Sequence, residues 1–281
     1  MVAKISASSR LIPVEPLHPS AFAPFGEVIQ NPATHDNQPS LSTVEANQGS
    51  ATKCLDVTSM RNWYELSQSK KPASVKMNMF VCRPRKLQKR NGEEVFDVKI
   101  LERHPFTPQT FVPLGLAGGD RSTSFLVIVA PTLPLNPRLR EKEGIIDPAY
   151  PVPAPQRKRS LRERLLGARP NPFTNDFMTS ITATSEPPLA HRPKGPGLPD
   201  LDNLRAFIAR GDQAVTYGAG TWHAPMVVLG EQPVDFVVVQ YMSGVALDDV
   251  QEVEIESSSD GLAVNVHDMA FADAGGVRSK L

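Results

Sequence analysis

The sequence predicts a mainly β fold, an antiparallel β-barrel with a few short helices. Apolar, strand-like runs recur along the chain, short glycine- and proline-rich turns separate them, and few segments have helical periodicity. At 281 residues with 40% hydrophobic content, the chain is long enough to bury a full core. We therefore expect a single domain over residues 1–281.

Three predicted strands carry most of this prediction. Residues 77–82 alternate between two faces and end before Arg83 and Pro84. Residues 124–131, SFLVIVAP, form a continuous apolar run of the kind that is buried on both faces. Residues 234–241, VDFVVVQY, give another strong strand.

Shorter elements are predicted around these strands. Pro19 favours the start of a short helix that Gly26 ends. Residues 31–50 are polar and without periodicity, which indicates a long loop. In residues 200–208, DLDNLRAFI, an aspartate suited to an N-cap precedes apolar residues at helical spacing, so a helix is expected. EVEIE, residues 252–256, is expected to be a last strand at a sheet edge.

Composition predicts one insertion and one tail. Residues 131–199 carry about half of the prolines and the basic cluster of residues 157–169, which indicates a surface insertion within the domain. The basic cluster also resembles a nucleic-acid patch, but a solvated surface loop is the preferred interpretation. Residues 257–281 are expected to form a flexible C-terminal tail.

Charge and cysteine content narrow the class of function. Thirty basic and thirty acidic residues cancel, so neither nucleic acid nor an anionic membrane is an expected partner. The chain has two cysteines and no C-x-x-C pair, which argues against a disulfide framework. It has no apolar leader and no run of eighteen apolar residues. We expect a protein that is not secreted and that acts on a small molecule.

Two segments carry the predicted chemistry. In residues 95–104, VFDVKILERH, alternation predicts that Glu102 and His104 share one inward strand face with Phe96, Val98 and Ile100. After the turn at residues 105–108, a return strand would begin at Gln109, so these side chains would meet inside one hairpin.

His223 is expected to join them from a later segment, GDQAVTYGAGTWHAPM, in which Gly218 and Gly220 allow a sharp corner. The spacing E-x-H-x4-Q is similar to the H-x-H-x3-4-E motif of cupin barrels. The later glycines and His223 fit the second cupin segment in part. This similarity specifies a cupin-like antiparallel barrel of the jelly-roll type.

At these residues the chain resembles the ureidoglycolate lyase family, cupin-fold enzymes of allantoin degradation that release urea and glyoxylate. The resemblance rests on LERHP with Gln109, on FLVIVAP, LRAFI, TYGAGTWHAP and DFVVVQY, all in family order. It covers residues 11–256 apart from the proline-rich stretch. It implies ureidoglycolate as substrate, a homodimer and, in some members, a divalent metal of the nickel type.

The expected roles follow from this chemistry. Glu102, His104 and His223 are the catalytic candidates, and with Gln109 they are the candidate metal ligands. Mixed imidazole and oxygen ligands suit nickel, iron, manganese or zinc, and metal-free catalysis with Glu102 as base stays open.

The expected substrate-binding residues would hold the carboxylate and ureido ends. They are Asn47, Lys53 and Arg83, with Trp222 either as a pocket wall or as plain core. Two alternatives remain: another metal-dependent cupin enzyme, and a non-catalytic cupin that binds a small ligand.

The last three residues predict a location. Ser279, Lys280 and Leu281 spell SKL, which at a C-terminus is an address that the peroxisomal import receptor recognises. We therefore expect a peroxisomal enzyme, and a cytoplasmic one if this tripeptide is not used.

Overall fold

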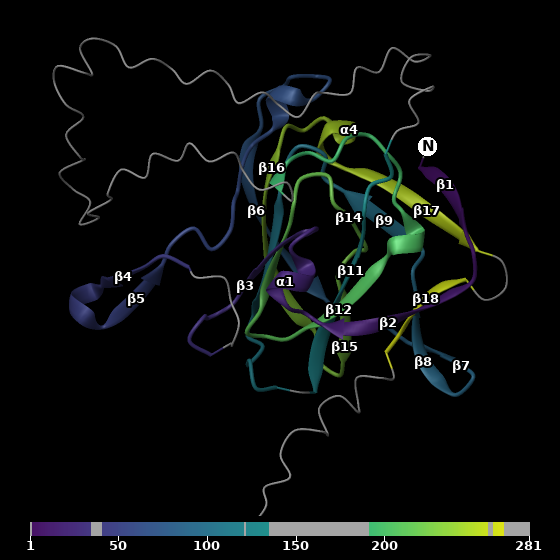
Figure 1. Ribbon diagram of the computed structural model, residues 1–281, viewed down its shortest axis with the longest axis horizontal. Coiled ribbons are helices and arrows are strands. Elements are labelled where there is room, and N and C mark those ends of the chain that lie inside the picture. The colour runs from purple at the N-terminus through teal and green to yellow at the C-terminus, as the bar shows by residue number, and fades with distance from the viewer. Residues whose placement is uncertain (1, 35–40, 121, 135–190, 258–260, 267–281) are drawn as a thin grey trace, which may run out of the picture.

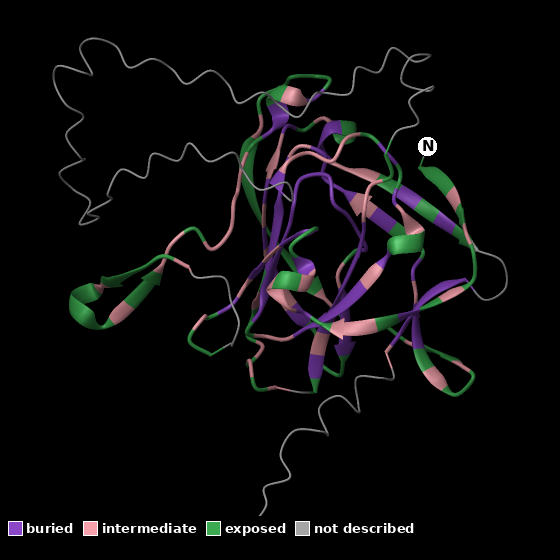
Figure 2. Cartoon of the chain, in the orientation of Figure 1, coloured by how far each residue is buried: buried purple, intermediate pink, exposed green. Residues whose placement is uncertain are grey.

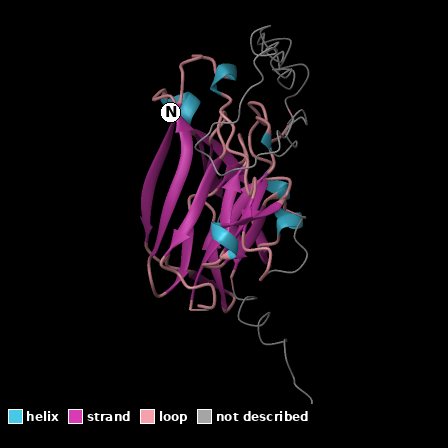
Figure 3. Cartoon of the chain, turned by 90° about the vertical axis from the view of Figure 1, so that its left-hand side faces the viewer, coloured by secondary structure: helices cyan, strands magenta, loops and turns pink. Residues whose placement is uncertain are grey.

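The computed structural model describes residues 2–34, 41–120, 122–134, 191–257 and 261–266. These residues form two large sheets and a projecting two-stranded hairpin (Figure 1). Helices are few and short, and strands dominate the view along the sheets (Figure 3). The predicted mainly β fold is confirmed, and the arrangement is consistent with a cupin-like barrel.

The larger sheet contains eleven strands. In spatial order they are β1 (Ala3–Ala7), β17 (Gln251–Ser257), β9 (Ile100–Arg103), β14 (Trp222–His223), β11 (Thr123–Ala130), β12 (Arg205–Ala209), β2 (Arg10–Pro16), β18 (Leu262–Asn265), β8 (Glu93–Asp97) and β7 (Gln88–Arg90), while β15 (Val227–Gly230) pairs with β11. Most neighbours are antiparallel. The N-terminal strands are the exception, because β1 pairs in parallel with β17, and β2 with β12 and β18.

The smaller sheet is antiparallel throughout and faces the larger one. Its five strands are β3 (Gly26–Ile29), β13 (Ala214–Tyr217), β10 (Gln109–Leu114), β16 (Val234–Met242) and β6 (Ser74–Cys82). The third sheet is the hairpin of β4 (Thr43–Ala46) and β5 (Ala51–Cys54).

The helical elements are single turns at the ends of strands. They are the α-helices α1 (Pro19–Phe22) and α4 (Ala246–Asp249) and the 3₁₀ turns η1 (Asn47–Gly49), η2 (Tyr64–Leu66) and η4 (Leu201–Asn203). The predicted helix at Pro19 is confirmed as α1, but it ends at Phe22, and Gly26, expected to end it, begins β3. No described helix has the length and apolar character that crossing a membrane requires.

Two hydrophobic cores lie on the two faces of the larger sheet. One fills the space between the sheets and includes Phe111 and Phe236 from the smaller sheet and Phe125 and Phe207 from the larger. The other lies where the larger sheet curves over its opposite face, around Trp222. Figure 2 shows both regions as buried.

Strand β11 connects these cores. Phe125, Val127 and Val129 belong to the core between the sheets, while Leu126 and Ile128 belong to the other core. A strand with both faces buried needs a continuous apolar sequence, so the prediction for residues 124–131 is confirmed.

The helix expected over residues 200–208 is wrong. Asp200 does accept a hydrogen bond from the backbone N–H of Asp202, but the helical part ends after one 3₁₀ turn, and residues 205–209 form β12. This strand packs Ala206 and Ile208 on one face and Phe207 on the other, so after Arg205 at its start every position is apolar and buried. Helical spacing cannot be distinguished from a strand buried on both faces when all positions are apolar.

The predicted continuous strand before His104 is also wrong in one respect. It breaks at Val98 and Lys99, where pairing passes from β18 to β17 and β14. Phe96 and Val98 therefore face the core around Trp222, together with Leu101, and do not share a face with Glu102.

The C-terminal prediction needs two corrections. EVEIE is no sheet edge, because β17 lies between β1 and β9. The flexible tail expected from residue 257 begins too early, because residues 262–265 form β18, which is buried between β2 and β8. Residues 267–281, with the terminal SKL, lie outside the described residues.

Most of the predicted insertion, residues 135–190, also lies outside the described residues. Its two ends meet in the body: the Leu133 N–H donates to the Leu198 carbonyl at 2.8 Å, and Thr132 bridges to Pro199. Residues 191–199 pack into the fold, since the carbonyls of His191 and Gly197 accept hydrogen bonds from Trp63 and Trp222. The chain thus leaves and re-enters the body at adjacent points.

Residues 43–54, which we call the arm, form β4, η1 and β5. The loop predicted over residues 31–50 is therefore wrong in part, because it contains β4 and η1 and leads directly into β5. The arm extends from the side of the body formed by β6 and β16 (Figure 1). The main contacts of β4, β5 and η1 are with one another, and none of the arm's residues is buried (Figure 2).

Candidate active site

Four predicted side chains converge between the two sheets. Glu102 lies on β9, His104 follows that strand, Gln109 begins β10, and His223 ends β14. His223 Nε2 lies 3.5 Å from Glu102 Oε1 and 3.1 Å from Gln109 Oε1. Glu102, His104 and His223 each offer one potential ligand atom, and these atoms lie within 4.8 Å of one another.

The pairing of strands explains how residues so distant in sequence meet. His223 stands directly opposite Glu102 in the larger sheet, so both side chains project from the same face. The turn before His223 contains Gly220 with φ of 75°, a conformation that favours glycine. The Gly220 N–H donates to the His104 carbonyl at 2.8 Å and holds this turn against the end of β9.

The site spans two sheets. Glu102, His104 and His223 belong to the larger sheet or its end, whereas Gln109 belongs to the smaller. The prediction that Glu102, His104 and Gln109 meet inside one hairpin is therefore wrong. Residues 105–108 carry the chain from one sheet to the other.

Backbone carbonyls fix the orientation of both imidazoles. His104 Nδ1 lies 2.7 Å from the Asp249 carbonyl, and His223 Nδ1 lies 3.0 Å from the Thr221 carbonyl. Because a carbonyl oxygen only accepts, each Nδ1 carries the proton and donates it. The Nε2 of each ring therefore points into the site: the buried His104 Nε2 has no hydrogen-bond partner among the described residues, and His223 Nε2 faces the side-chain oxygens of Gln109 and Glu102.

Burial and neighbouring charges set the protonation states. Burial, with a smaller contribution from the nearby His223, lowers the pKa of His104 to about 4, so this ring is neutral at pH 7. Burial alone would raise the pKa of Glu102, but the hydrogen bond and charge of His223 outweigh it and hold the pKa below its ordinary value. Glu102 is therefore ionised at pH 7.

Three residues that the sequence analysis missed support this set. Tyr217 stacks on His223 with ring centroids 4.0 Å apart and an angle of 10°. Gln240 accepts a hydrogen bond from Gln109 Nε2 at 2.7 Å, which turns Gln109 Oε1 toward His223. The third is Asp249, through its carbonyl. Tyr217 lies inside the glycine-rich segment already singled out, but spacing alone gives no sign of its stacking.

A family model described as ureidoglycolate lyase matches residues 9–261 of the chain. The chain belongs to the ureidoglycolate lyase family. It is 28% identical to a ureidoglycolate lyase of Schizosaccharomyces pombe, over 89% of this chain and 94% of that protein. It is 31% identical to one of Saccharomyces cerevisiae, over 82% and 85% of the two chains. A Burkholderia mallei relative of the same name is 25% identical over 82% of each chain.

In this member of the ureidoglycolate lyase family, the residues expected to bind substrate lie apart from the four convergent side chains. Asn47 and Lys53 are exposed on the arm. Arg83 is exposed just beyond β6. Gln109 pairs with Gln240, and Gln240 pairs with Lys76, so Lys76 marks the level of Gln109 on β6. Arg83 lies seven residues beyond Lys76, which at the rise of a strand is roughly 23 Å from that level.

Trp222 faces the opposite side of β14 from His223. It is buried in the second core, where its Nε1 donates to the Gly197 carbonyl at 3.1 Å. The Arg103 guanidinium lies 4.4 Å from its ring centroid. Of the two interpretations of Trp222, this position favours core packing over a pocket wall.

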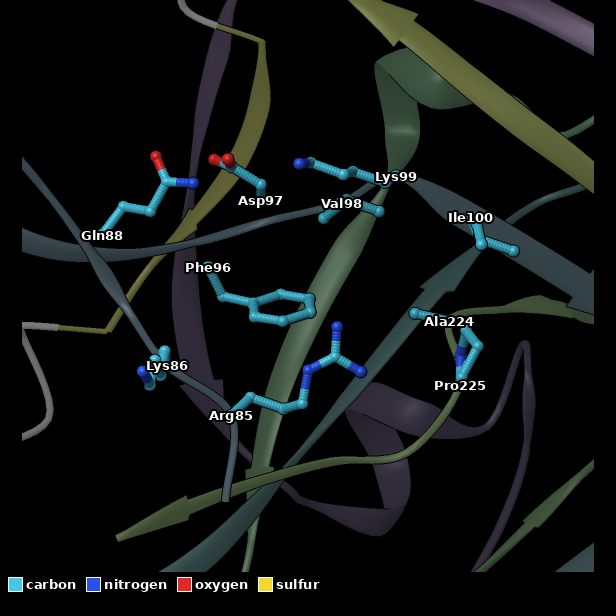
Figure 4. A pocket seen from close by; sticks show the side chains of 10 residues that line it. All are labelled: Arg85, Lys86, Gln88, Phe96, Asp97, Val98, Lys99, Ile100, Ala224 and Pro225. Atoms are coloured by element: carbon cyan, nitrogen blue, oxygen red, sulfur yellow. The ribbon is translucent and has the colours of Figure 1, made fainter. Parts of the chain in front are cut away.

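A separate cavity of about 210 Å³ opens on that opposite side, next to Ala224 and Pro225. Figure 4 shows the Arg85 guanidinium directed toward the Phe96 ring, at 5.6 Å from its centroid. Lys86 and Lys99 also line it. None of the predicted site residues does, so this cavity is distinct from the convergent set.

Proposed function

We propose that this chain is a ureidoglycolate lyase, which eliminates urea from ureidoglycolate and leaves glyoxylate. One observation carries the proposal: in a member of this family, an ionised glutamate stands beside two buried imidazoles and one amide oxygen. Such a set can exchange protons with a small polar substrate. The shared family name of its relatives supports the same substrate.

The reaction needs a base that can also return a proton. Ureidoglycolate carries a hydroxyl, a ureido nitrogen and a carboxylate on or beside one carbon. Glu102 takes the hydroxyl proton, the oxygen forms the aldehyde double bond, and the carbon–nitrogen bond breaks. The same carboxyl group then gives its proton to the departing nitrogen, so urea leaves neutral and Glu102 is ionised again.

The neighbours of Glu102 assist it. An oxygen of Gln109 and the Nε2 of each histidine lie where the hydroxyl of the substrate would bind, and Tyr217 keeps the His223 ring in place. Of the set, Glu102 alone is not fully buried, with 21% of its side chain exposed, so an entering substrate reaches it first.

The donor set also fits a divalent metal. When His223 is neutral, its Nε2 lone pair faces the oxygens of Gln109 and Glu102. These acceptor atoms repel one another, and a cation bound between them would remove that repulsion. His104, His223 and Gln109 would hold the ion, with Glu102 as a fourth ligand or as the base. A bound ion would act as a Lewis acid on the hydroxyl. Elemental analysis and chelation, followed by re-addition of nickel or manganese, test this.

The activity has a direct test. The purified protein is incubated with racemic ureidoglycolate, and glyoxylate, urea and ammonia are measured. We expect glyoxylate and urea in equal amounts without ammonia, and nearly complete loss of both in His223→Ala. Release of ammonia would indicate an amidohydrolase. Binding without turnover would indicate a cupin that only binds the ligand, and full turnover in His223→Ala would contradict the assigned site.

We also propose a homodimer. Strand β6 and the end of β10 turn their outward side chains to solvent, and we call Val75, Met77, Met79, Val81, Val112 and Leu114 the outer face of the smaller sheet. Met77 is 72% exposed and Val81 64%. A continuous apolar patch of this kind usually marks an interface. Sedimentation of the wild type should give a dimer, and Met77→Glu combined with Met79→Glu should give a monomer.

The peroxisomal location is a further part of the proposal. It rests on Ser279, Lys280 and Leu281, which would bind the import receptor. A fluorescent protein fused to the N-terminus should give peroxisomal puncta, and the same fusion without Leu281 should be diffuse. Diffuse fluorescence from both fusions would place the enzyme in the cytoplasm.

A further inference from the structure

The arm is unusual because its two strands make their main contacts with each other and with the turn η1 between them. Its strands pair over four positions only, and none of its residues is buried. An isolated two-stranded hairpin is marginally stable in water. Its turn holds Asn47 at φ of 49° and Gln48 at φ of 58°, a left-handed backbone that is uncommon outside glycine. Such a turn persists when surrounding contacts stabilise it.

The arm originates on the outer face. Residues 58–60 return from it across the outward side of the smaller sheet, where Thr58 Oγ1 donates to Thr216 Oγ1 at 2.8 Å. Thr110 Oγ1 lies 3.1 Å from Met60 Sδ on the same side. A second copy packed on the outer face would therefore lie directly against the root of the arm. In a twofold dimer each arm would extend over the other subunit.

The active site needs a group of the kind that the arm carries. Glu102, Gln109, His104 and His223 present mainly acceptors, and in the described part of the chain the ion pair of Glu102 is with His223 and not with a lysine or arginine. The substrate that we propose above carries a carboxylate, which calls for a cation. The arm offers the exposed Lys53, with the Asn47 amide at its turn.

We propose that the arm of each subunit crosses to its partner and completes the partner's active site, with Lys53 on the substrate carboxylate and Asn47 on the ureido group. This rests on the proposed lyase function. The occupant of the outer face is a second copy of the chain, because only a copy brings an arm with it.

The first test compares two lysines on exposed hairpins. Lys53→Met should lower kcat/KM for ureidoglycolate by roughly 10- to 100-fold, mainly through KM, because a charge-assisted hydrogen bond is lost. Lys89→Met, on the hairpin of β7 and β8, is the matched control and should stay within about twofold of the wild type. An active wild type with an unaffected Lys53→Met would overturn the arm's role and leave the lyase proposal standing.

The second test asks which subunit supplies the lysine. Lys53→Met and His223→Ala chains with different affinity tags are co-expressed, and the mixed dimer is purified through both tags. One of its two sites then combines a wild-type His223 with the partner's intact arm. We expect about half of the wild-type activity per dimer, although each parent is nearly inactive. A mixed dimer as inactive as its parents would show that the arm serves its own subunit.

A third measurement needs no substrate, so it judges the arm even if the lyase proposal fails. Gln48→Cys, made in a Cys54→Ser and Cys82→Ser background, is labelled with an environment-sensitive fluorophore. We expect blue-shifted emission from the dimer and red-shifted emission after Met77→Glu and Met79→Glu. Equal emission from both, or an active wild type that sediments as a monomer, would overturn the proposal.

Discussion

Asp249→Asn should reduce both stability and activity, although this carboxylate is not one of the four convergent side chains. Its Oδ1 accepts hydrogen bonds from the Tyr64 hydroxyl at 2.8 Å and from the Ser243 N–H and hydroxyl at 2.7 and 2.9 Å. Its Oδ2 accepts from the Gly244 N–H at 2.7 Å. These bonds hold the loop whose Asp249 carbonyl accepts the Nδ1 proton of His104.

The magnitude follows from what the asparagine can no longer accept. Three bonds lose their charge assistance, at about 0.5–1 kcal/mol each, and the new NH₂ group opposes the Gly244 N–H, at about 1–2 kcal/mol. The free energy of unfolding should fall by roughly 3–4 kcal/mol in urea titrations. Because the loop also sets the position of His104, kcat/KM should fall at least about tenfold.

The adjacent Asp248 provides the control. Its carboxylate accepts a hydrogen bond from Ser69, and its carbonyl does not contact His104, so Asp248→Asn should cost about 1 kcal/mol and leave kcat/KM unchanged. An Asp249→Asn protein with wild-type stability would refute the hydrogen-bond argument. One that is destabilised but fully active would refute the link to His104.

Three further predictions concern the site and its frame. Burial lowers the pKa of His104 from 6.5 to about 4, so its contribution to stability is complete above pH 6.5 and about 3 kcal/mol is lost as pH falls toward 4; His104→Asn should flatten that part of the stability profile. Gly26→Ala should lower the melting temperature sharply, since a Cβ there would lie 1.9 Å from the Thr216 carbonyl oxygen; an unchanged melting temperature would contradict this packing. Replacing residues 137–188 by a short flexible linker should leave turnover intact, because the chain ends are already joined at Leu133 and Leu198. Loss of activity in a folded deletion protein would assign the segment a role at the site.

The sequence alone was enough to predict that Glu102 and His104, which are two residues apart, belong to one site. Alternation places Glu102 and His104 on one face, and the glycines before His223 indicate a corner that presents it. The spacing identified Gln109, but it did not predict that Gln109 belongs to the other sheet. A four-residue connection can either close a hairpin or carry the chain from one sheet to another. Tyr217 and Gln240 depend on strand register, which no single strand specifies.

The same limit explains why the sequence did not show that Asn47 and Lys53 lie away from the four convergent side chains, and why one strand was missed. Asn47 and Lys53 have suitable chemistry, but only the three-dimensional path of the chain shows that they stand on the arm. In residues 206–209 both strand faces are buried, so no polar position remains there to distinguish a period of 2 from 3.6. Local sequence patterns therefore predicted which types of side chain belong to the site, but not how far each lies from the others.

The crossing at residues 105–108 makes the active site sensitive to the spacing of the two layers. Glu102 and His104 move with one sheet and Gln109 with the other, so the gap between them depends on the aromatic side chains stacked between the sheets. Phe236, deep in that core, contacts both Phe111 and Phe125 with centroids 5.9 and 5.1 Å away. Repacking such a residue changes the distance between Glu102 and Gln109 without altering either side chain, so the geometry of the site can evolve through the core.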